Sequence, residues 1–266
     1  MCGLAGVFLA PKKRSASELE AIADIFTANL IANEVRGRDA TGVAMIRANG
    51  EFQIEKAPVP ASTFVRSPRY EAALSTLDER VVCLMGHTRL PTQGDPEDNR
   101  NNHPIMVGEV VGMHNGYIVN DSALFEHFRF PRAGEVDSEI IFRMLAALTP
   151  QQSPLHYMSK VIDHVQLLEG PMAVMAVDLQ NPSRLLVIKD GSPLCVHYEP
   201  KYEALFFSSR YLFLRKAFGR SVITEALPAP SVMLFDADNL EERVSLRLER
   251  EPLPRFMPAC CSALAA

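Results

Sequence analysis

The sequence contains little that would suit a membrane or a nucleic acid. No stretch approaches the roughly 18 consecutive apolar residues that a membrane-spanning helix needs. Lys and Arg number 27 against 32 Asp and Glu, and the net charge of −5 offers no basic footprint for a phosphate backbone. The 266 residues also contain no internal repeat and no low-complexity linker. We therefore expect neither a membrane nor a nucleic acid as a partner.

Cysteine is scarce and lacks the spacing of a metal site or a disulfide framework. The five cysteines stand at positions 2, 83, 195, 260 and 261, and no CxxC pair occurs. The apolar N-terminus, MCGLAGVFLA, precedes its basic residues instead of following them, which is the reverse of a secretory signal. These features indicate a reduced, cytoplasmic chain without structural zinc. We expect no metal and no cofactor.

The composition and the periodicity of the apolar residues indicate a globular α+β protein. Hydrophobic residues make up 47% of the chain and charged residues 22%, which argues against disorder. Helical spacing predicts helices near 17–33, 121–129, 138–148, 155–168 and 210–217. Apolar runs predict strands near 3–10, 42–48, 51–56, 80–87, 109–114, 172–178, 184–189, 194–198, 203–208 and 231–236. This order differs from the regular alternation of a parallel sheet, so we expect stacked layers.

Cys2 is the residue with the sharpest chemical signal. Methionine aminopeptidase generally removes Met1 when a small residue follows, and the mature chain would then begin with Cys2. A terminal cysteine carries a thiol nucleophile and an amine whose pKa of about 7.7–8.0 suits a general base. Gly3 and Gly6 would let a substrate approach the backbone closely. The alternative is an ordinary cysteine in a buried first strand.

Further polar residues could serve either chemistry or structure. They are Arg36 in RGRDATG, Arg89 at the end of a buried strand, His103 in NNHP, Asn115 and Gly116 at another strand end, and Asp137 before a helix. Arginine can hold a carboxylate, an Asn amide with a Gly N–H can stabilise an oxyanion, and aspartate can bind an ammonium. The structural alternatives are a charged turn, an ion pair, a loop closure, a tight turn and a helix N-cap.

Taken together and in order, nine blocks of the sequence resemble the glutaminase domain of the class II glutamine amidotransferases, which are N-terminal-nucleophile (Ntn) hydrolases. The blocks are MCGLAGVF, RGRDATG, GHTRLPTQG, NNHPI, HNGYIVND, VDSE, EGPMAVMAVD, KDGSPL and LFFSSR, and they span about residues 2–235. Similar domains occur in glucosamine-6-phosphate synthase and in glutamine phosphoribosylpyrophosphate amidotransferase. The resemblance implies a four-layer αββα fold, with two antiparallel sheets between helix layers. We expect one glutaminase domain over 2–250 and an irregular tail over 251–266.

The resemblance also implies an activity, with L-glutamine as the substrate, and a role for each site residue. Cys2 would attack the side-chain amide and form a γ-glutamyl thioester. The other implied roles are Asn115 and Gly116 as oxyanion hole, Arg89 at the α-carboxylate, Thr92 and His103 in the loop that carries Arg89, Asp137 at the α-ammonium, and Arg36 as support for the terminal nucleophile. Only about 30 residues follow the last motif, so the ammonia would pass to a separate synthase subunit. Homo-oligomerisation stays open.

The loop between two of these motifs departs from the family pattern. Leu90-Pro91 stands where some members carry an aromatic residue that closes over the substrate, and Gln93 replaces a histidine found in some. The whole stretch, 88–104, is rich in Pro, Asn and Asp, so we expect a long loop with few buried contacts.

Two rival functions remain. One is an Ntn amidohydrolase that acts on a different amide, and it would not need both Arg89 and Asp137. The other is a non-catalytic, glutamine-sensing subunit on the same fold, and it would tolerate the loss of Cys2 or Asn115.

Overall fold

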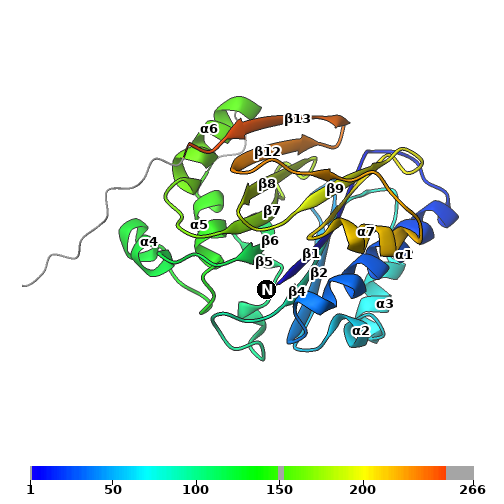
Figure 1. Cartoon of the computed structure of the whole chain (residues 1–266), viewed down its shortest axis with the longest axis horizontal. Coiled ribbons are helices and arrows are strands. Elements are labelled where there is room, and N and C mark those ends of the chain that lie inside the picture. The colour runs from blue at the N-terminus through cyan, green and yellow to red at the C-terminus, as the bar shows by residue number, and fades with distance from the viewer. Residues whose placement is uncertain (1, 149–152, 250–266) are drawn as a thin grey trace, which may run out of the picture.

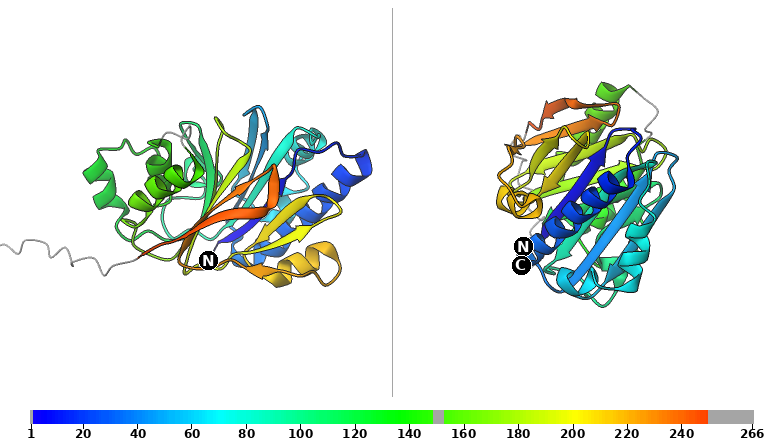
Figure 2. Two further views of the ribbon diagram at one scale, coloured as in Figure 1. Left: turned by 90° about the horizontal axis from the view of Figure 1, so that it is seen from above. Right: turned by 90° about the vertical axis from the view of Figure 1, so that its right-hand side faces the viewer.

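Two antiparallel sheets lie face to face between two layers of helices in the computed structural model, which describes residues 2–148 and 153–249 (Figure 1, Figure 2). Three apolar cores fill the spaces between the four layers. This arrangement confirms the αββα fold that the resemblance implied. The expected tail, 251–266, lies outside the described residues.

The first sheet carries the beginning of the chain and has the strand order β11-β9-β10-β1-β4-β2-β3. Its strands are β1 (Gly3–Leu9), β2 (Ala40–Arg47), β3 (Phe52–Ala57), β4 (Val81–Arg89), β9 (Cys195–Glu199), β10 (Ala204–Ser208) and β11 (Glu225–Ala226). β1 is buried along its whole length. Because side chains alternate along a strand, Leu4 and Phe8 enter the core between the sheets, while Ala5 and Val7 enter the core under the helices.

The second sheet has the strand order β13-β12-β8-β7-β6-β5. Its strands are β5 (Ile105–Val107), β6 (Val110–Gly116), β7 (Met172–Asp178), β8 (Arg184–Asp190), β12 (Ser231–Asp236) and β13 (Asn239–Arg247). Met113 and Met175 pack against the first sheet, whereas Val174 and Ile188 belong to the outer core. The continuous apolar runs that predicted β7 and β8 arise because both faces of these strands are covered.

Helices cover the outer face of each sheet. The helices over the first sheet are α1 (Ala16–Asn33), α2 (Ala61–Phe64), α3 (Pro68–Ser75) and α7 (Tyr211–Phe218), and those over the second are α4 (Asp121–Phe128), α5 (Glu139–Ala146) and α6 (Pro154–Val165). Ser15 and Glu18 form the expected capping box at the start of α1. Ser153 caps α6 by accepting a hydrogen bond from the His156 N–H. None of the described helices is long and apolar enough to cross a membrane.

Three strand ends meet where the chain begins (Figure 1). Gly3, the first residue of β1, pairs with Thr88 near the end of β4. β6 of the other sheet approaches from the opposite side, where His87 Nε2 lies 3.1 Å from the His114 carbonyl oxygen. Residues from both sheets therefore converge around Cys2.

Candidate active site

Backbone contacts hold Cys2 where the ends of β1, β4 and β6 meet. Its half-buried side chain places Sγ 3.4 Å from both the N and the O of Leu90. Arg36 ends the short 3₁₀ helix η1 (Glu34–Arg36), and its Nε donates to the Cys2 carbonyl oxygen over 2.6 Å. Arg36 therefore contacts the residue that it is predicted to support, and the supporting role itself stays a prediction.

The thiol of Cys2 needs a base in order to react. Burial raises its pKa, and the hydrogen bond from Leu90 and the positive charge of Arg89 offset only part of that effect. The thiol is therefore protonated at neutral pH, whereas the nucleophilic form of cysteine is the thiolate. Sγ contacts only backbone atoms of Leu90 among the hydrogen-bond partners in the described part of the chain. A terminal amine on the same residue would supply the missing base.

Arg89 ends β4 beside Cys2 and is almost completely buried, at 3% exposure. Its Nη1 donates to Asn102 Oδ1 over 2.8 Å, and its Nη2 donates to the carbonyl oxygens of Gln93 (2.5 Å) and Gly94 (2.9 Å). No carboxylate among the described residues forms an ion pair with it, so the simple ion-pair alternative is wrong. Because guanidinium has five N–H donors and these bonds use three of them, two N–H donors are left unused.

The close packing around Arg89 explains a glycine in the RGRDATG block. A Cβ on Gly37 would lie 2.3 Å from the Arg89 carbonyl carbon, and only glycine leaves room for this approach. The Asp39 N–H also donates to the Arg89 carbonyl oxygen over 3.0 Å. The block thus anchors the strand end that carries Arg89.

Asp137 precedes α5 but does not act as its N-cap. Ser138 occupies the N-cap position and makes no capping hydrogen bond with its side chain. The Asp137 carboxylate instead accepts from the Ile118 N–H over 2.6 Å, and the residue is only 3% exposed. Its negative charge raises the pKa of Cys2 while that of Arg89 lowers it. Two opposite charges therefore act on the same thiol.

Asn115 and Gly116 close β6 and remain paired with β7, so they do not form the tight turn of the structural alternative. Asn115 is 1% exposed, and its Nδ2 donates to Ser209 Oγ over 2.9 Å. Gly116 has φ 133°, and a Cβ there would lie 1.8 Å from the Pro171 carbonyl oxygen. Both strain and crowding therefore require glycine at position 116.

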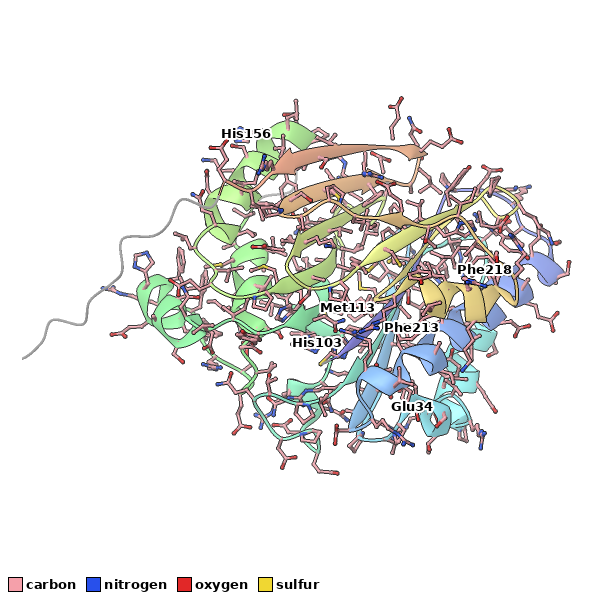
Figure 3. All side chains as sticks on the ribbon, viewed as in Figure 1. Glu34, His103, Met113, His156, Phe213 and Phe218 are labelled. Atoms are coloured by element: carbon pink, nitrogen blue, oxygen red, sulfur yellow. The ribbon has the colours of Figure 1, made fainter. Side chains whose placement is uncertain are left out.

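Thr92 and His103 come from the same loop but end in different surroundings. The Thr92 side chain is exposed, and no hydrogen bond joins it to the described residues. His103 lies inside the molecule, while His156 lies on its outer edge (Figure 3). The ring centroid of His103 is 4.3 Å from that of His87.

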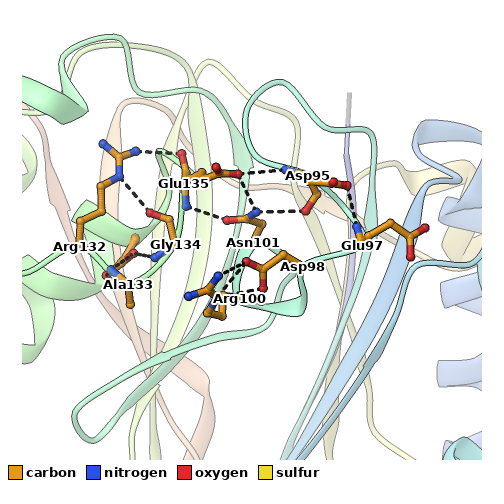
Figure 4. A network of polar contacts seen from close by, with 10 residues as sticks. Asp95, Glu97, Asp98, Arg100, Asn101, Arg132, Ala133, Gly134 and Glu135 are labelled. Atoms are coloured by element: carbon orange, nitrogen blue, oxygen red, sulfur yellow. Dashed lines mark hydrogen bonds and ion pairs between the residues drawn. The ribbon is translucent and has the colours of Figure 1, made fainter.

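The loop over 88–104 is anchored more firmly than its composition suggested. It contains the 3₁₀ helix η2 (Asn99–Asn101), and Asn101 is completely buried. Asn101 Nδ2 donates to the Asp95 carbonyl oxygen and to Glu135 Oε2, and its Oδ1 accepts from the Glu135 N–H over 2.7 Å (Figure 4). The expectation of few buried contacts was therefore wrong for the second half of the loop. Asparagine can replace the backbone partners that a long loop lacks.

Three buried histidines, His87, His103 and His114, lie next to the site. The sequence indicated only His103 as a candidate residue. Burial lowers the pKa of His87 to about 3 and that of His114 to about 4, and it holds the pKa of His103 well below its usual range. His114 Nδ1 lies 2.8 Å from Ser138 Oγ. All three rings are therefore neutral at pH 7. No three potential ligand side chains within 2–148 and 153–249 are placed to hold a metal ion.

Comparison with known proteins identifies relatives of the chain. It is 30% identical to a glutamine–fructose-6-phosphate aminotransferase (isomerizing) of Vibrio parahaemolyticus over 74% of this chain and 30% of that protein. It is 32% identical to the enzyme of the same name from Aquifex aeolicus over 61% of this chain and 26% of that protein. A 7-cyano-7-deazaguanine synthase of Saccharolobus solfataricus is 28% identical over 88% of this chain and 48% of that protein. The chain thus spans between about a quarter and a half of these relatives. No family model matches it.

Solved structures share the fold. Glutamine phosphoribosylpyrophosphate amidotransferase from B. subtilis superposes with a TM-score of 0.70 at 16% identity, over 94% of this chain and 50% of that chain. A class II glutamine aminotransferase domain protein from Silicibacter pomeroyi gives a TM-score of 0.57 at 14% identity, over 92% of this chain and 99% of that chain. Sequence and fold together show that the chain belongs with the class II glutamine amidotransferases, as a relative of their N-terminal-nucleophile glutaminase domain.

Proposed function

We propose that the chain hydrolyses the side-chain amide of L-glutamine and supplies the ammonia to a synthase partner. The observation that carries the proposal is the half-buried thiol of Cys2 with the opposite charges of Arg89 and Asp137 acting on it. Free glutamine presents an α-carboxylate and an α-ammonium, and these two charges are complementary to Arg89 and Asp137. An amide substrate that lacked either charged group would leave Arg89 or Asp137 without an opposite charge in the site.

In the first half-reaction, the Cys2 thiol attacks the side-chain carbonyl carbon while the terminal amine takes its proton. The carbonyl oxygen becomes an oxyanion, which Asn115 Nδ2 and the Gly116 N–H would stabilise. The protonated amine then gives its proton to the leaving nitrogen, and ammonia departs as the carbon–nitrogen bond breaks. A γ-glutamyl thioester remains on Cys2.

In the second half-reaction, water attacks the thioester carbonyl and the amine again takes the proton. The carbon–sulfur bond breaks, glutamate leaves, and the thiol recovers its proton. Arg89 and Asp137 hold the amino-acid end throughout, with Thr92 and His103 contributing to the loop around it. Arg36 keeps the terminal residue in place through its hydrogen bond to the Cys2 carbonyl oxygen.

The partner would use the ammonia, and residues 2–250 would act as one glutaminase domain. The curated relatives named above are longer than the matched region by a factor of about two or more, and their names denote aminotransferases and a synthase. We propose that a separate protein takes the place of their remaining parts. We place the reaction in the cytoplasm, where the free thiols of Cys2, Cys83 and Cys195 would stay reduced.

The test is to measure glutamate and ammonia released from glutamine by the purified protein, with asparagine as the matched amide. Glutamine should be hydrolysed and asparagine should not, and Cys2→Ala should remove the activity while leaving the unfolding transition intact. Preference for another amide would support the rival amidohydrolase. If the protein binds glutamine but releases no ammonia, either alone or with any partner protein added, the result would support the glutamine-sensing subunit.

A further inference from the structure

The carboxamide of Asn115 has a buried oxygen with no partner. Its Nδ2 donates to Ser209 Oγ over 2.9 Å, but its Oδ1 is buried and makes no hydrogen bond with the described residues. Leaving a buried polar atom unpaired is costly. A turn of 180° about the Cβ–Cγ bond exchanges the two ends of a carboxamide, so both orientations have to be compared with the surrounding donors and acceptors.

Ser209 offers Asn115 a donor. Its Oγ already accepts from the Leu4 N–H over 2.8 Å, and its own N–H donates to the Leu4 carbonyl oxygen over 3.0 Å. A hydroxyl has one proton, and with Asn115 Nδ2 also donating to it, this proton has no acceptor among the described residues. If Asn115 turned its Oδ1 toward Ser209, the hydroxyl proton would be used and the oxygen would be paired.

His87 offers Asn115 an acceptor on the other side. Burial lowers the pKa of His87 to about 3, so the ring is neutral, and an interaction with the Asn115 side chain that opposes this shift places the two side chains within reach of each other. Its Nε2 faces the His114 carbonyl oxygen at 3.1 Å, and a carbonyl can only accept, so Nε2 carries the ring proton. Nδ1 is then a lone-pair acceptor, and it is buried without a partner. It suits an N–H of Asn115 and repels Oδ1.

We propose that Ser209 and His87 are positioning residues that hold the Asn115 amide with Oδ1 toward Ser209 and Nδ2 toward His87. The chain of donors then runs from the Leu4 N–H through the Ser209 hydroxyl to Asn115 Oδ1, and from Asn115 Nδ2 through His87 to the His114 carbonyl oxygen. Every buried polar atom in it is paired. The second Nδ2 hydrogen remains free for the oxyanion. This inference rests on the proposed function, since it assigns how the oxyanion donor is aimed.

The inference explains why a serine is placed at this point of the fold. Ser209 follows β10, Leu4 lies on β1 two residues after Cys2, and Asn115 lies on the other sheet. One hydroxyl therefore links the strand of the nucleophile to the amide of the oxyanion hole, across the two sheets. Removing it would affect the transition state and leave the groups that bind glutamine in place.

The experiment is a double-mutant cycle on steady-state glutamine hydrolysis, with Ser209→Ala, Asn115→Ala and both together. We expect Asn115→Ala to lower kcat by about 10²- to 10³-fold. Ser209→Ala should lower kcat by at least about tenfold with KM nearly unchanged, and Ser209→Thr, which keeps the hydroxyl, should recover most of the loss. In the Asn115→Ala protein, Ser209→Ala should have almost no further effect, because its action passes through the amide.

Ser208→Ala is the matched control. Ser208 is equally buried, but its hydroxyl donates to Asn29 Oδ1 over 2.8 Å and does not contact Asn115. This variant should keep kcat close to the wild-type value. A full effect of Ser209→Ala in the Asn115→Ala background would mean that Ser209 acts through Leu4 and β1, and it would overturn the inference.

Two outcomes separate this inference from the proposed function. Full activity of Asn115→Ala would reject the oxyanion role itself, whereas full activity of Ser209→Ala beside an inactive Asn115→Ala would reject only the positioning role. A measurement on the unmodified protein is independent of whether the variants fold. Histidine ¹⁵N NMR should find His87 neutral with the proton on Nε2, and a proton on Nδ1 would overturn the inference.

Discussion

A thiol becomes useful in catalysis when its surroundings hold both a base and a substrate in reach. Cys2 contacts the backbone of Leu90, the charges of Arg89 and Asp137 act on its thiol, and burial raises its pKa. A base on the same residue can act without any further side chain, because the terminal amine titrates near neutral pH. The role of the amine is therefore the most consequential feature of the proposed mechanism.

Conservative changes at the two charged residues should weaken substrate binding. Arg89→Lys keeps the charge but loses the fixed fork, and Asp137→Asn removes the charge that would pair with the α-ammonium. We expect each to raise KM by about tenfold to more than a hundredfold, because a charged hydrogen bond contributes about 1.5–3 kcal/mol. Steady-state kinetics with glutamine provide the measurement. Normal KM values in both variants would mean that the two residues only support the structure.

The neutral histidines should make the folded state sensitive to mild acid. The folded-state pKa values of His87 and His114, about 3 and about 4, lie below the unfolded value of about 6.5. The unfolded chain therefore binds more protons than the folded chain below pH 6.5, and stability falls as the pH falls. At pH 5 the loss is up to about 2 kcal/mol for each such histidine. Urea unfolding at pH 7 and pH 5 measures it.

A pair of variants tests the assignment of this pH effect. His114→Asn should reduce the slope of stability against pH between 6.5 and 5 by up to about 1.4 kcal/mol per pH unit. The exposed residue His156 is the control, and His156→Gln should leave the slope as it is. Equal slopes in all three proteins would contradict the account of His114 as a buried neutral ring.

The sequence predicted the residues with distinctive chemistry better than the residues that hold them in position. Cys2 and the two charged residues stand out because their chemistry is unusual at a chain start or a strand end. Ser209 and His87 do not stand out, because their partners come from other strands and, for Ser209 and Asn115, from 94 positions away. A single sequence does not reveal which buried serine faces which amide.

At the scale of elements, the loop over 88–104 and the segment before α5 are tied together. Asn101 bonds to Asp95 and Glu135, and Asn102 holds Arg89. Lys56 reinforces the loop by donating to the Asn102 carbonyl oxygen over 2.9 Å. Arg89 lies at one end of this network, and Asp137 follows Glu135 by two residues. The network thereby fixes the position of Arg89 relative to Asp137, the two residues that would bind the charged groups of glutamine.

Breaking this network should affect binding and stability together. Asn101→Ala removes a completely buried side chain and leaves the partly buried Glu135 N–H and Asp95 carbonyl oxygen without this partner, so we expect a loss of about 1–3 kcal/mol in stability and a higher KM. Urea unfolding and glutamine kinetics measure the two effects. Arg100→Ala is the control, because its ion pair with Asp98 is exposed and such pairs contribute between about 0 and 1 kcal/mol. Equal results for the two variants would contradict the anchoring role.

The predicted elements were close to those observed wherever a periodic apolar pattern existed. The capping box at Ser15 and the Ser153-Pro154 start of α6 were also confirmed. The sequence predicted neither the short elements α2, α3, β5 and β11 nor the longer strand β13. The polar NLEERVSLR segment of β13 lies at the edge of its sheet and is largely exposed, so its apolar alternation is weak.

At the scale of the whole molecule, we predict that the isolated chain is a slow glutaminase that its partner activates. The curated relatives extend well beyond the matched region, and an uncontrolled glutaminase would waste glutamine. Since Asn101 to His103 are buried, the mobile part of the loop would be its exposed first half around Thr92 and Gln93. A partner that binds only the closed form would shift the loop toward closure by its differential affinity.

Kinetics on the purified chain, alone and with a co-purifying protein, measure this activation. The rate of glutamine hydrolysis should rise when the partner is added, and ammonia should appear in the partner's product and not in solution. Full-speed hydrolysis by the chain alone, unchanged by each protein that co-purifies with it, would indicate a dedicated glutaminase instead.

The most direct test of the account is the mass of the intact chain before and after reaction with the glutamine analogue 6-diazo-5-oxo-norleucine. We predict that active protein lacks Met1, gains a single adduct, and carries that adduct on Cys2. Cys83 and Cys195 should stay unlabelled, because both thiols lie in the apolar cores beside the sheets and neither residue carries a terminal amine that could act as its base. Active protein that retains Met1, or an adduct on Cys83 or Cys195 in place of Cys2, would contradict the central claim.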